Sequence, residues 1–228
     1  MIVEASVLVS CEMLRSGAGV GVWSSGRGSV GVVFFLKKRN IVKKYIRIVG
    51  GQFRRTPIEV IEADGLRPTP DRVRETLFNW LNFFWQGDFE SKRVLDLFAG
   101  SGALGFEAAS RGVAHVQMVE QHPKAVAALR ALRDKLGAQA VRIHAGDAKH
   151  VVGRLEAARF DLIFLDPPFG KNWLEELWPI LPNLLEPNGL VYIEAEKPIF
   201  VPEQYDLLRQ DRAGAVHYHL IQIAALQK

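Results

Sequence analysis

The sequence has little cysteine and no long hydrophobic run. Cys11 is the one cysteine among 228 residues, so no intramolecular disulfide can form, which agrees with a reducing compartment. No apolar run approaches the roughly 20 residues of a membrane-spanning helix. Two acids and a single arginine precede the first weak apolar run, and this pattern does not fit a signal peptide. These absences predict a cytoplasmic protein without a membrane partner, and we expect it to be a monomer.

The sequence also lacks a metal-binding pattern. Its six histidines do not form a set of ligands. His217 and His219 alternate along one predicted strand, but a metal site would need a third and a fourth ligand. We therefore expect no bound metal.

Positive charge is concentrated in the N-terminal third. Residues 1–75 hold 13 Lys and Arg against 7 Asp and Glu, a balance of +6, whereas the remaining residues hold 16 against 18, a balance of −2. Eight basic residues and no acid lie between Lys37 and Arg55. This asymmetry favours a polyanion held by the N-terminal part, and a solvated basic face is the alternative.

The chain divides into three predicted regions. Residues 1–40 mix valines with Gly and Ser clusters and show no sustained helical or strand period, which indicates a mobile N-terminal extension or a start codon placed too far upstream. Residues 41–90 form a basic N-terminal element, a hairpin followed by a helix. Residues 91–228 form an α/β domain, and the 48% hydrophobic content suffices for one substantial core.

The N-terminal element shows short strands and then a helix. Residues 46–49 and 58–61 are strand candidates on either side of a glycine pair. Thr69 is predicted to cap a helix that begins at Pro70. One face of that helix carries an apolar stripe, and Arg72 and Arg74 lie off it. The stripe is made of Val73, Leu77, Trp80, Leu81 and Phe84.

The remainder alternates strand and helix, which is typical of a parallel sheet with crossover helices. A final run over 216–224 alternates like an antiparallel strand. We therefore predict a doubly wound, Rossmann-like α/β fold with a mostly parallel sheet and an antiparallel C-terminal strand. The predicted parallel strands are 93–97, 115–119, 141–144, 160–165 and 189–194, and the helices between them cover 103–111, 123–136 and 173–181.

A glycine turn follows the first of these strands. Gly100, Gly102 and Gly105 fit Gly-x-Gly-x-x-Gly, in which the first two let the backbone lie against a ligand and the third lets helix and strand pack closely. The pattern alone suits a nicotinamide or flavin dinucleotide as well as S-adenosylmethionine. Asp96 lies inside the end of the strand, four residues before the first glycine, where a dinucleotide fold normally has an apolar residue.

Four acids fall at or just after predicted strand ends, where ligands of open parallel sheets bind. Glu120 follows Gly100 by twenty residues, the distance at which an acid takes ribose hydroxyls. Asp147 can accept from an adenine amine, although it can also cap the helix that Ala148 opens. Asp96 can serve the methionine end of a cofactor or brace the glycine loop. The predicted cofactor-binding set is Asp96, Phe98, Gly100, Gly102, Glu120, Asp147 and Ala148.

The tetrapeptide Asp166-Pro167-Pro168-Phe169 follows another apolar run. Its prolines lack an N–H and keep the chain extended, so the Asp166 carboxylate and the Pro167 carbonyl remain free acceptors. Two acceptors that hold the hydrogens of an exocyclic base amine would pull its nitrogen toward tetrahedral geometry and aim the lone pair at a methyl donor. Phe169 offers a face for an unstacked base. The alternative is a rigid loop with a buried aromatic ring.

Together, the carboxylate at the first strand and this tetrapeptide resemble the amino-group methyltransferases that use S-adenosylmethionine. From about Tyr45 to Leu226 the chain resembles more closely the bacterial RsmD family, guanine N2-methyltransferases of 16S ribosomal RNA in the small subunit. The resemblance rests on Arg47-Ile48-Val49-Gly50-Gly51, Leu66-Arg67-Pro68-Thr69, the run from Asp71 to Leu81, Asp96-Leu97-Phe98-Ala99-Gly100-Ser101-Gly102 and Asp166-Pro167-Pro168-Phe169.

The resemblance implies that residues 91–228 are an S-adenosylmethionine-dependent methyltransferase domain acting on the small ribosomal subunit or its precursor. It implies that the base enters beside Asp166, with Pro167 and Phe169 in the catalytic set. It also implies that the N-terminal element faces RNA. The RNA-binding candidates are Arg54, Arg55, Arg67, Thr69, Arg72 and Arg74. Residues 1–40 lie outside the family pattern.

Three other functions compete with this one. A DNA adenine-N6 or cytosine-N4 methyltransferase uses the same tetrapeptide, but it usually carries a separate recognition region for which no segment is spare. An NAD-dependent oxidoreductase is suggested by the glycine motif alone. A non-catalytic ribosome-assembly factor of the same fold would not need the intact Asp166 tetrapeptide. Ring-carbon methylation is disfavoured, because its nucleophilic cysteine would have to be Cys11 in the extension.

Overall fold

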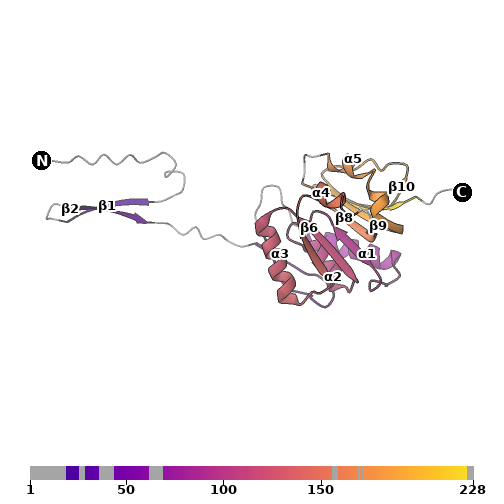
Figure 1. The fold of residues 1–228 in the computed structure, drawn as a ribbon, viewed down its shortest axis with the longest axis horizontal. Helices are drawn as coiled ribbons and strands as arrows, with labels where there is room; N and C mark the ends of the chain where they lie inside the picture. Colours follow the sequence, from indigo (N-terminus) through magenta and orange to yellow (C-terminus); the bar gives the residue numbers. More distant parts are fainter. Residues whose placement is uncertain are drawn as a thin grey trace. The chain divides into compact units, whose positions relative to one another are not determined.

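The computed structural model describes residues 19–25, 29–35, 44–61, 69–155, 159–168, 170 and 172–224, the first two segments as backbone only. The chain forms two units, Met1–Val42 and Lys43–Lys228. In the first unit, β1 (Gly19–Ser25) pairs antiparallel with β2 (Ser29–Phe35) (Figure 1). The sequence analysis found no sustained strand period in residues 1–40 and did not predict these two strands.

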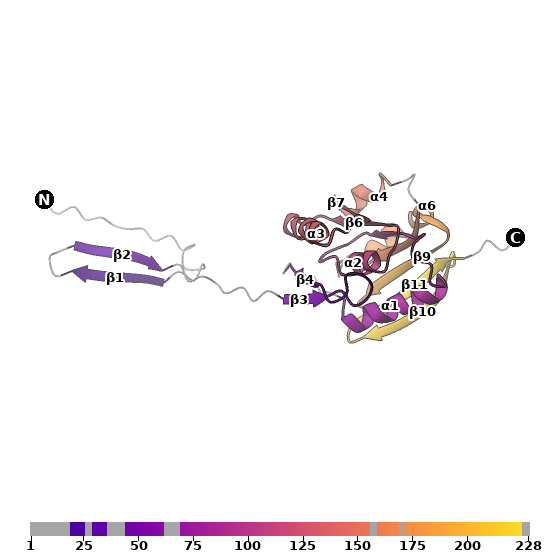
Figure 2. The ribbon, with the colours of Figure 1, turned by 90° about the horizontal axis from the view of Figure 1, so that it is seen from below.

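A seven-stranded sheet organises the second unit, in the order β10-β11-β9-β8-β5-β6-β7. The five strands from β9 to β7 are parallel, and β11 and β10 are antiparallel additions at one edge (Figure 2). This arrangement confirms the predicted sheet. The strands are β5 (Arg93–Asp96), β6 (His115–Glu120), β7 (Val141–Ala145), β8 (Phe160–Leu165), β9 (Leu185–Ala195), β10 (Tyr205–Ala213) and β11 (Val216–Ile223).

Helices cover both faces of the sheet. The central strands carry apolar side chains on both faces, so each face must be shielded from water by a layer of helices. One hydrophobic core includes residues of α1 (Asp71–Phe84), α2 (Ala103–Ser110) and α3 (Pro123–Leu136). The other includes residues of α4 (Ala148–Val152), α5 (Trp173–Leu177) and α6 (Leu181–Leu184). Two helical layers on a mostly parallel sheet make the fold doubly wound, as predicted. Among the described residues, no helix is long and apolar enough to cross a membrane.

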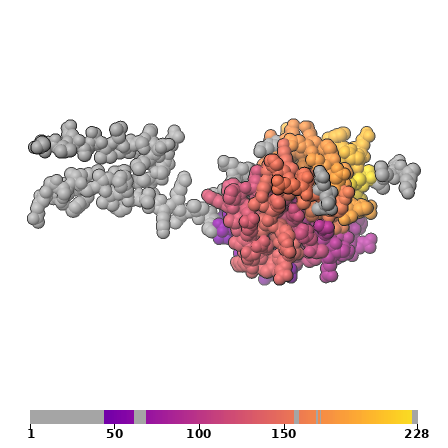
Figure 3. Space-filling model, in the orientation of Figure 1, coloured from indigo at the N-terminus to yellow at the C-terminus, as the bar shows by residue number. Residues whose placement is uncertain are grey.

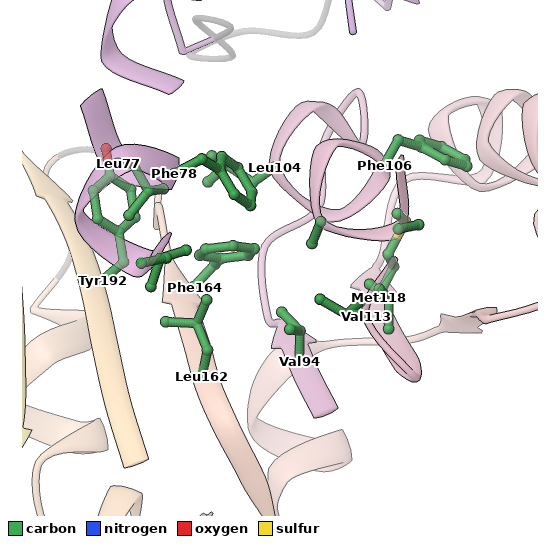
Figure 4. Close-up of a cluster of buried hydrophobic side chains, with 14 of the residues drawn as sticks. Leu77, Phe78, Val94, Leu104, Phe106, Val113, Met118, Leu162, Phe164 and Tyr192 are labelled. Atoms are coloured by element: carbon green, nitrogen blue, oxygen red, sulfur yellow. The ribbon is translucent and has the colours of Figure 1, made fainter. Parts of the chain in front are cut away.

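Helix α1 packs over β8 and β9. Figure 4 shows Leu77 and Phe78 of α1 beside Phe164 of β8 and Tyr192 of β9. The ring centres of Phe78 and Phe164 are 6.3 Å apart, and those of Phe164 and Tyr192 are 6.1 Å apart, both with edge-to-face geometry. These contacts fix α1 close to the carboxyl end of β8.

The start of α1 differs from the prediction. The helix begins at Asp71, with Pro70 at its N-cap and no side-chain cap. Thr69 does not cap it, because the Thr69 hydroxyl instead donates to Glu194 Oε1 at 2.8 Å. The predicted apolar stripe is largely confirmed, since Val73 and Leu77 are fully buried.

A two-stranded ribbon precedes α1. β3 (Lys44–Arg47) pairs antiparallel with β4 (Pro57–Val60), close to the predicted bounds. The turn between them is held by α2, because the buried Glu107 carboxylate accepts from the backbone N–H groups of Val49 at 2.7 Å and Gly50 at 2.8 Å. The ribbon is therefore anchored to the helix that follows the glycine loop.

Two other boundaries differ from the sequence prediction. β9 begins at Leu185 rather than at Gly189. The helix predicted over 173–181 ends at Leu177 and is followed by the separate short helix α6, whose second position is Pro182. Proline lacks the N–H that a continuous helix would need there.

Candidate active site

The topological switch of the sheet lies between β5 and β8. From β5 the chain proceeds outward to β6 and β7, and it then returns to the other side of β5 as β8 and β9. Ligands of such sheets bind outside the carboxyl ends of the strands at this switch. In the space-filling view of the second unit, the last third of the chain, orange to yellow, occupies one side of the visible face (Figure 3).

A cavity of about 670 Å³ opens at these strand ends. Its walls combine apolar side chains from the segment after β5, from β6 and from α5 with three acids, which suits a nucleoside with a flat base and ribose hydroxyls. The lining residues are Leu97, Phe98, Val119, Glu120, Gln121, His122, Pro123, Gly146, Asp147, Ala148, Asp166, Pro168 and Trp173.

The glycine loop beside this cavity depends on the absence of side chains. Gly100 and Gly102 have φ of 53° and 82°, which glycine adopts readily. A Cβ on Gly102 would lie 2.5 Å from Leu129 Cδ2, and one on Gly105 would lie 2.5 Å from Met118 Cε. The loop therefore lies close against Leu129 of α3, and the start of α2 packs closely on Met118 of β6.

Glu120 and Asp147 both line the cavity. One oxygen of Glu120 accepts from Gly100 N at 2.8 Å and the other from His122 N at 2.7 Å. Asp147 Oδ1 accepts from Lys149 N at 2.9 Å, so Asp147 caps α4, the alternative that the sequence left open. Ala148 is buried beneath it. A cap uses part of the carboxylate and leaves lone pairs for a ligand.

Asp96 lies beneath the glycine loop. Its side chain is almost fully buried, and Asp96 Oδ2 accepts from Gly105 N at 3.1 Å. Burial raises the pKa of Asp96 to about 7, and the nearby acids Glu120 and Glu194 act in the same direction. Asp96 thus braces the loop and can change its charge near neutral pH.

Asp166 lies where two cavities meet. A second, small pocket of about 40 Å³ shares Phe98 and Asp166 with the large cavity. Burial and the neighbouring carboxyls of Glu194 and Asp96 raise the pKa of Asp166 well above its ordinary value. The other residues of the small pocket are Val60, Ile61, Thr69, Asp96, Ala99, Gly100, Ser101, Ala103 and Leu104.

Two predicted catalytic residues adjoin Asp166. Pro167 is half-buried, and residues 166–168 belong to no helix or strand. No helix therefore uses the carbonyl groups of these residues, whereas the predicted extended backbone stays a prediction. Phe169 lies outside the described residues, so its expected role as a stacking face stays a prediction.

The sequence analysis missed Glu194 and Tyr192. Glu194 is buried near the carboxyl end of β9, and its Oε1 accepts from Tyr192 Oη at 2.9 Å as well as from Thr69. The rule that selected the other four acids would have selected Glu194 too, because it ends the predicted strand 189–194. A carboxyl cluster of three residues, Asp96, Asp166 and Glu194, therefore lies along the ends of β5, β8 and β9.

The predicted RNA-facing residues do not share one environment. Arg54, Arg55 and Arg72 are exposed, as phosphate contacts require, and Arg67 lies outside the described residues. Arg74 is fully buried, which contradicts its predicted direct contact with RNA, whereas Thr69 is buried but lines the small pocket, so its predicted contact stays a prediction. Arg74 instead donates to the carbonyl oxygen of Thr69 at 2.7 Å and to Asp71 Oδ1 at 2.8 Å.

Arg74 was misjudged because its helical position borders the apolar stripe, and its guanidinium turns inward to satisfy backbone carbonyls. Thr69 lies with it under the start of α1. Among the described residues, no group of three or more His, Cys, Asp and Glu side chains is arranged to hold a metal ion.

Comparison with known proteins identifies the family. The family model described as conserved hypothetical protein 95 matches residues 46–222. Ribosomal RNA small subunit methyltransferase D of Haemophilus influenzae is 38% identical over 187 residues, which cover 79% of this chain and 95% of that protein. The protein of the same name from Escherichia coli K12 is 39% identical over 192 residues, covering 78% and 89%.

A solved structure agrees with these sequence matches. The putative methyltransferase yhhF from Escherichia coli is 37% identical, with a TM-score of 0.69, and the match covers 80% of this chain and 99% of that one. The predicted resemblance and the predicted Rossmann-like methyltransferase fold are confirmed. This chain belongs to the conserved hypothetical protein 95 family, the family of ribosomal RNA small subunit methyltransferase D.

Proposed function

We propose that this chain transfers a methyl group from S-adenosylmethionine to the exocyclic N2 amine of one guanine in 16S ribosomal RNA. The substrate is an assembled or assembling small subunit. The observation that carries the proposal is the position of Asp166, which lines both the large cavity and the small pocket. A group at this junction reaches both the cofactor and an incoming base.

The two cavities suit the two ends of the cofactor. Glu120 and Asp147 in the large cavity offer acceptors for ribose hydroxyls and an adenine amine. Asp96 and Ser101 in the small pocket suit the methionine end, whose ammonium a carboxylate attracts. When bound, the cofactor supplies an electrophilic methyl group on a sulfonium. Phe98, which lines both cavities, lies at the joint between the two ends.

Asp166 and the Pro167 carbonyl hold the target amine. Each accepts one N–H, so the nitrogen lone pair turns out of conjugation and toward the methyl carbon. The bound cofactor would supply the methyl carbon for the new N–C bond and would keep the electron pair of its broken C–S bond on sulfur. The displaced amine proton passes to Asp166, whose raised pKa makes it a better base than an ordinary carboxylate. In this scheme Asp166 both orients the amine and receives its proton.

The ribbon and the start of α1 hold the RNA. Arg54, Arg55 and Arg72 are exposed cations in the part of the chain with a charge balance of +6. Phosphate contacts of this kind fix position without reading sequence. Selection of one guanine then depends on the shape of a folded RNA–protein particle.

Mass mapping of methylated nucleosides tests the proposal. Small subunits from a strain lacking this gene are incubated with the protein and isotopically labelled S-adenosylmethionine, and the RNA is then digested to nucleosides. We expect one labelled N2-methylguanosine per subunit, less from protein-free RNA, and none with the Asp166→Ala variant. Label on a pyrimidine, or equal methylation of naked RNA and subunits, would contradict the proposal.

A DNA adenine-N6 or cytosine-N4 methyltransferase remains the second candidate, because Asp166 and Pro167 would hold any exocyclic amine. Duplex DNA in the same assay separates the two, since labelled N6-methyladenine or N4-methylcytosine would favour the DNA enzyme. The oxidoreductase is not proposed, because the named relatives are methyltransferases.

A further inference from the structure

Glu194 lies one strand away from Asp166, at the same level of the sheet. In the β8–β9 register, Phe164 is opposite Tyr192 and Leu165 is opposite Ile193. The next residues along the two chains are Asp166 and Glu194. Because side chains alternate between faces along a strand, the Glu194 carboxyl lies on the same face as Tyr192, which α1 covers, and it is close enough to Asp166 to act on its charge.

The hydrogen bonds of Glu194 favour its charged form. Its Oε1 accepts from the hydroxyls of Thr69 at 2.8 Å and Tyr192 at 2.9 Å. Burial raises the pKa of Glu194, whereas these two donors and the positive charge of Arg74 oppose that rise. For Asp166, in contrast, burial and both neighbouring acids act together to raise the pKa. Of the two carboxyls, Glu194 is thus the better place for a negative charge.

Glu194 reaches the ligand only through other residues. Within the described part of the chain, it is not among the residues lining either cavity, whereas its neighbours Asp166 and Thr69 both line the small pocket. Its carboxylate therefore forms a second layer behind the site. A charge in that position acts on a ligand through the electric field and through the residues that it holds in place.

We propose that Glu194 is a positioning residue that, acting behind Asp166 and Thr69, makes the site bind the cationic methyl donor more tightly than the neutral product. This inference rests on the proposed function. The donor carries a sulfonium charge, and the product carries an uncharged thioether sulfur. A negative charge on the Glu194 carboxylate, behind the residues that line the small pocket, would attract the first and not the second. Methyl transfer thereby removes the attraction that held the cofactor, and the product leaves more readily.

Calorimetric titration of the full chain with S-adenosylmethionine and with S-adenosylhomocysteine, without RNA, tests this role. Glu194→Gln keeps an acceptor oxygen for Thr69 and Tyr192 but removes the charge. We expect the preference for the donor over the product to fall about fivefold, as for a charge acting over several ångströms in a partly buried site. Glu196→Gln is the matched control, because Glu196 carries the same charge two residues further on and is exposed. The Glu196→Gln variant should prefer the donor over the product to the same degree as the wild type.

The ratio of the two affinities separates this role from a merely structural one, since a loosened pocket weakens both ligands together. An unchanged ratio in Glu194→Gln would overturn the inference while leaving the proposed function intact. Wild-type protein that binds neither ligand would instead overturn the proposed function. If Glu194→Gln does not fold, Tyr192→Phe removes one donor at nearly constant volume. It should lower the preference about twofold, a smaller change than full loss of the charge, and no change would again overturn the inference.

Discussion

A Cβ placed on Gly51 would lie 1.8 Å from the carbonyl oxygen of Ser110. Gly51 also has a φ of +74°, in the left-handed region. Ser110 further binds the same turn through its hydroxyl, which accepts from Phe53 N at 2.9 Å. The ribbon therefore meets α2 at a point where only a glycine fits.

Gly51→Ala should detach the ribbon from α2. The clash involves backbone, which cannot move aside as a flexible side chain can, so we expect a loss of about 3 kcal/mol or more in unfolding free energy. Gly87→Ala is the matched control, because Gly87 has a φ of +83° but its Cβ would meet nothing within 4 Å. The control should lose only about 1 kcal/mol, from the left-handed backbone alone. Equal losses in urea denaturation would contradict a specific contact with Ser110.

Asp166→Ala should lower turnover by orders of magnitude with little change in cofactor affinity, because the missing acceptor acts mainly in the transition state. Asp166→Asn keeps an acceptor oxygen but cannot take the proton, so it should retain more activity than Ala and less than the wild type. Single-turnover methylation of small subunits measures the rate for both variants. Normal turnover by the Ala variant would remove Asp166 from the mechanism.

Glu120→Ala should weaken S-adenosylmethionine binding by about 1–3 kcal/mol, because the proposed charge-assisted bond to the ribose would be lost. The same carboxylate also holds Gly100 N and His122 N, so the glycine loop should loosen as well. Glu120→Gln keeps one acceptor and should lose less. Calorimetry gives the affinities, and an unchanged value for the Ala variant would refute the assignment.

Asp96 should make stability depend on pH. Folding raises the pKa of Asp96 from 3.8 to about 7, so the folded state binds this proton more tightly than the unfolded state. The stabilisation is complete below about pH 4 and is lost as the pH rises through 7. Between pH 5 and pH 8 the wild type should lose on the order of a few kcal/mol of unfolding free energy. Asp96→Asn cannot ionise and should lose less, and identical pH profiles in urea denaturation would contradict the shift.

Charge reversal of Arg54, Arg55 and Arg72 should weaken binding to small subunits and reduce its salt dependence, with cofactor affinity unchanged. Each lost phosphate contact lowers the slope of log affinity against log salt by about 0.7–0.9. Arg130→Glu, on the exposed side of α3, is the control for net charge. Arg74→Glu should instead unfold the protein, because Arg74 is fully buried. Triple-reversal protein that binds subunits normally would exclude these arginines from the RNA interface.

Local pattern sufficed for most of the fold. The parallel strands were recognisable because they are apolar on both faces. The glycine loop and the Asp166 tetrapeptide were recognisable because each motif is formed by residues that are close together in the sequence. Thr69 and Arg74 were misassigned because their partners are distant or internal. A threonine before a proline favours a cap locally, but the hydroxyl finds Glu194, 125 residues away, and no periodicity reveals such a pair. Glu194 itself was recognisable, as an acid at a strand end.

The separation of Thr69 and Glu194 also sets an order of events during synthesis. When Thr69 is added to the nascent chain, Glu194 is still 125 codons from being translated, and β11, which pairs with β9, follows later still. At ordinary elongation rates this delay is on the order of ten seconds. A nascent chain therefore carries the ribbon and the Thr69 hydroxyl for that interval before it carries the carboxylate that this hydroxyl binds.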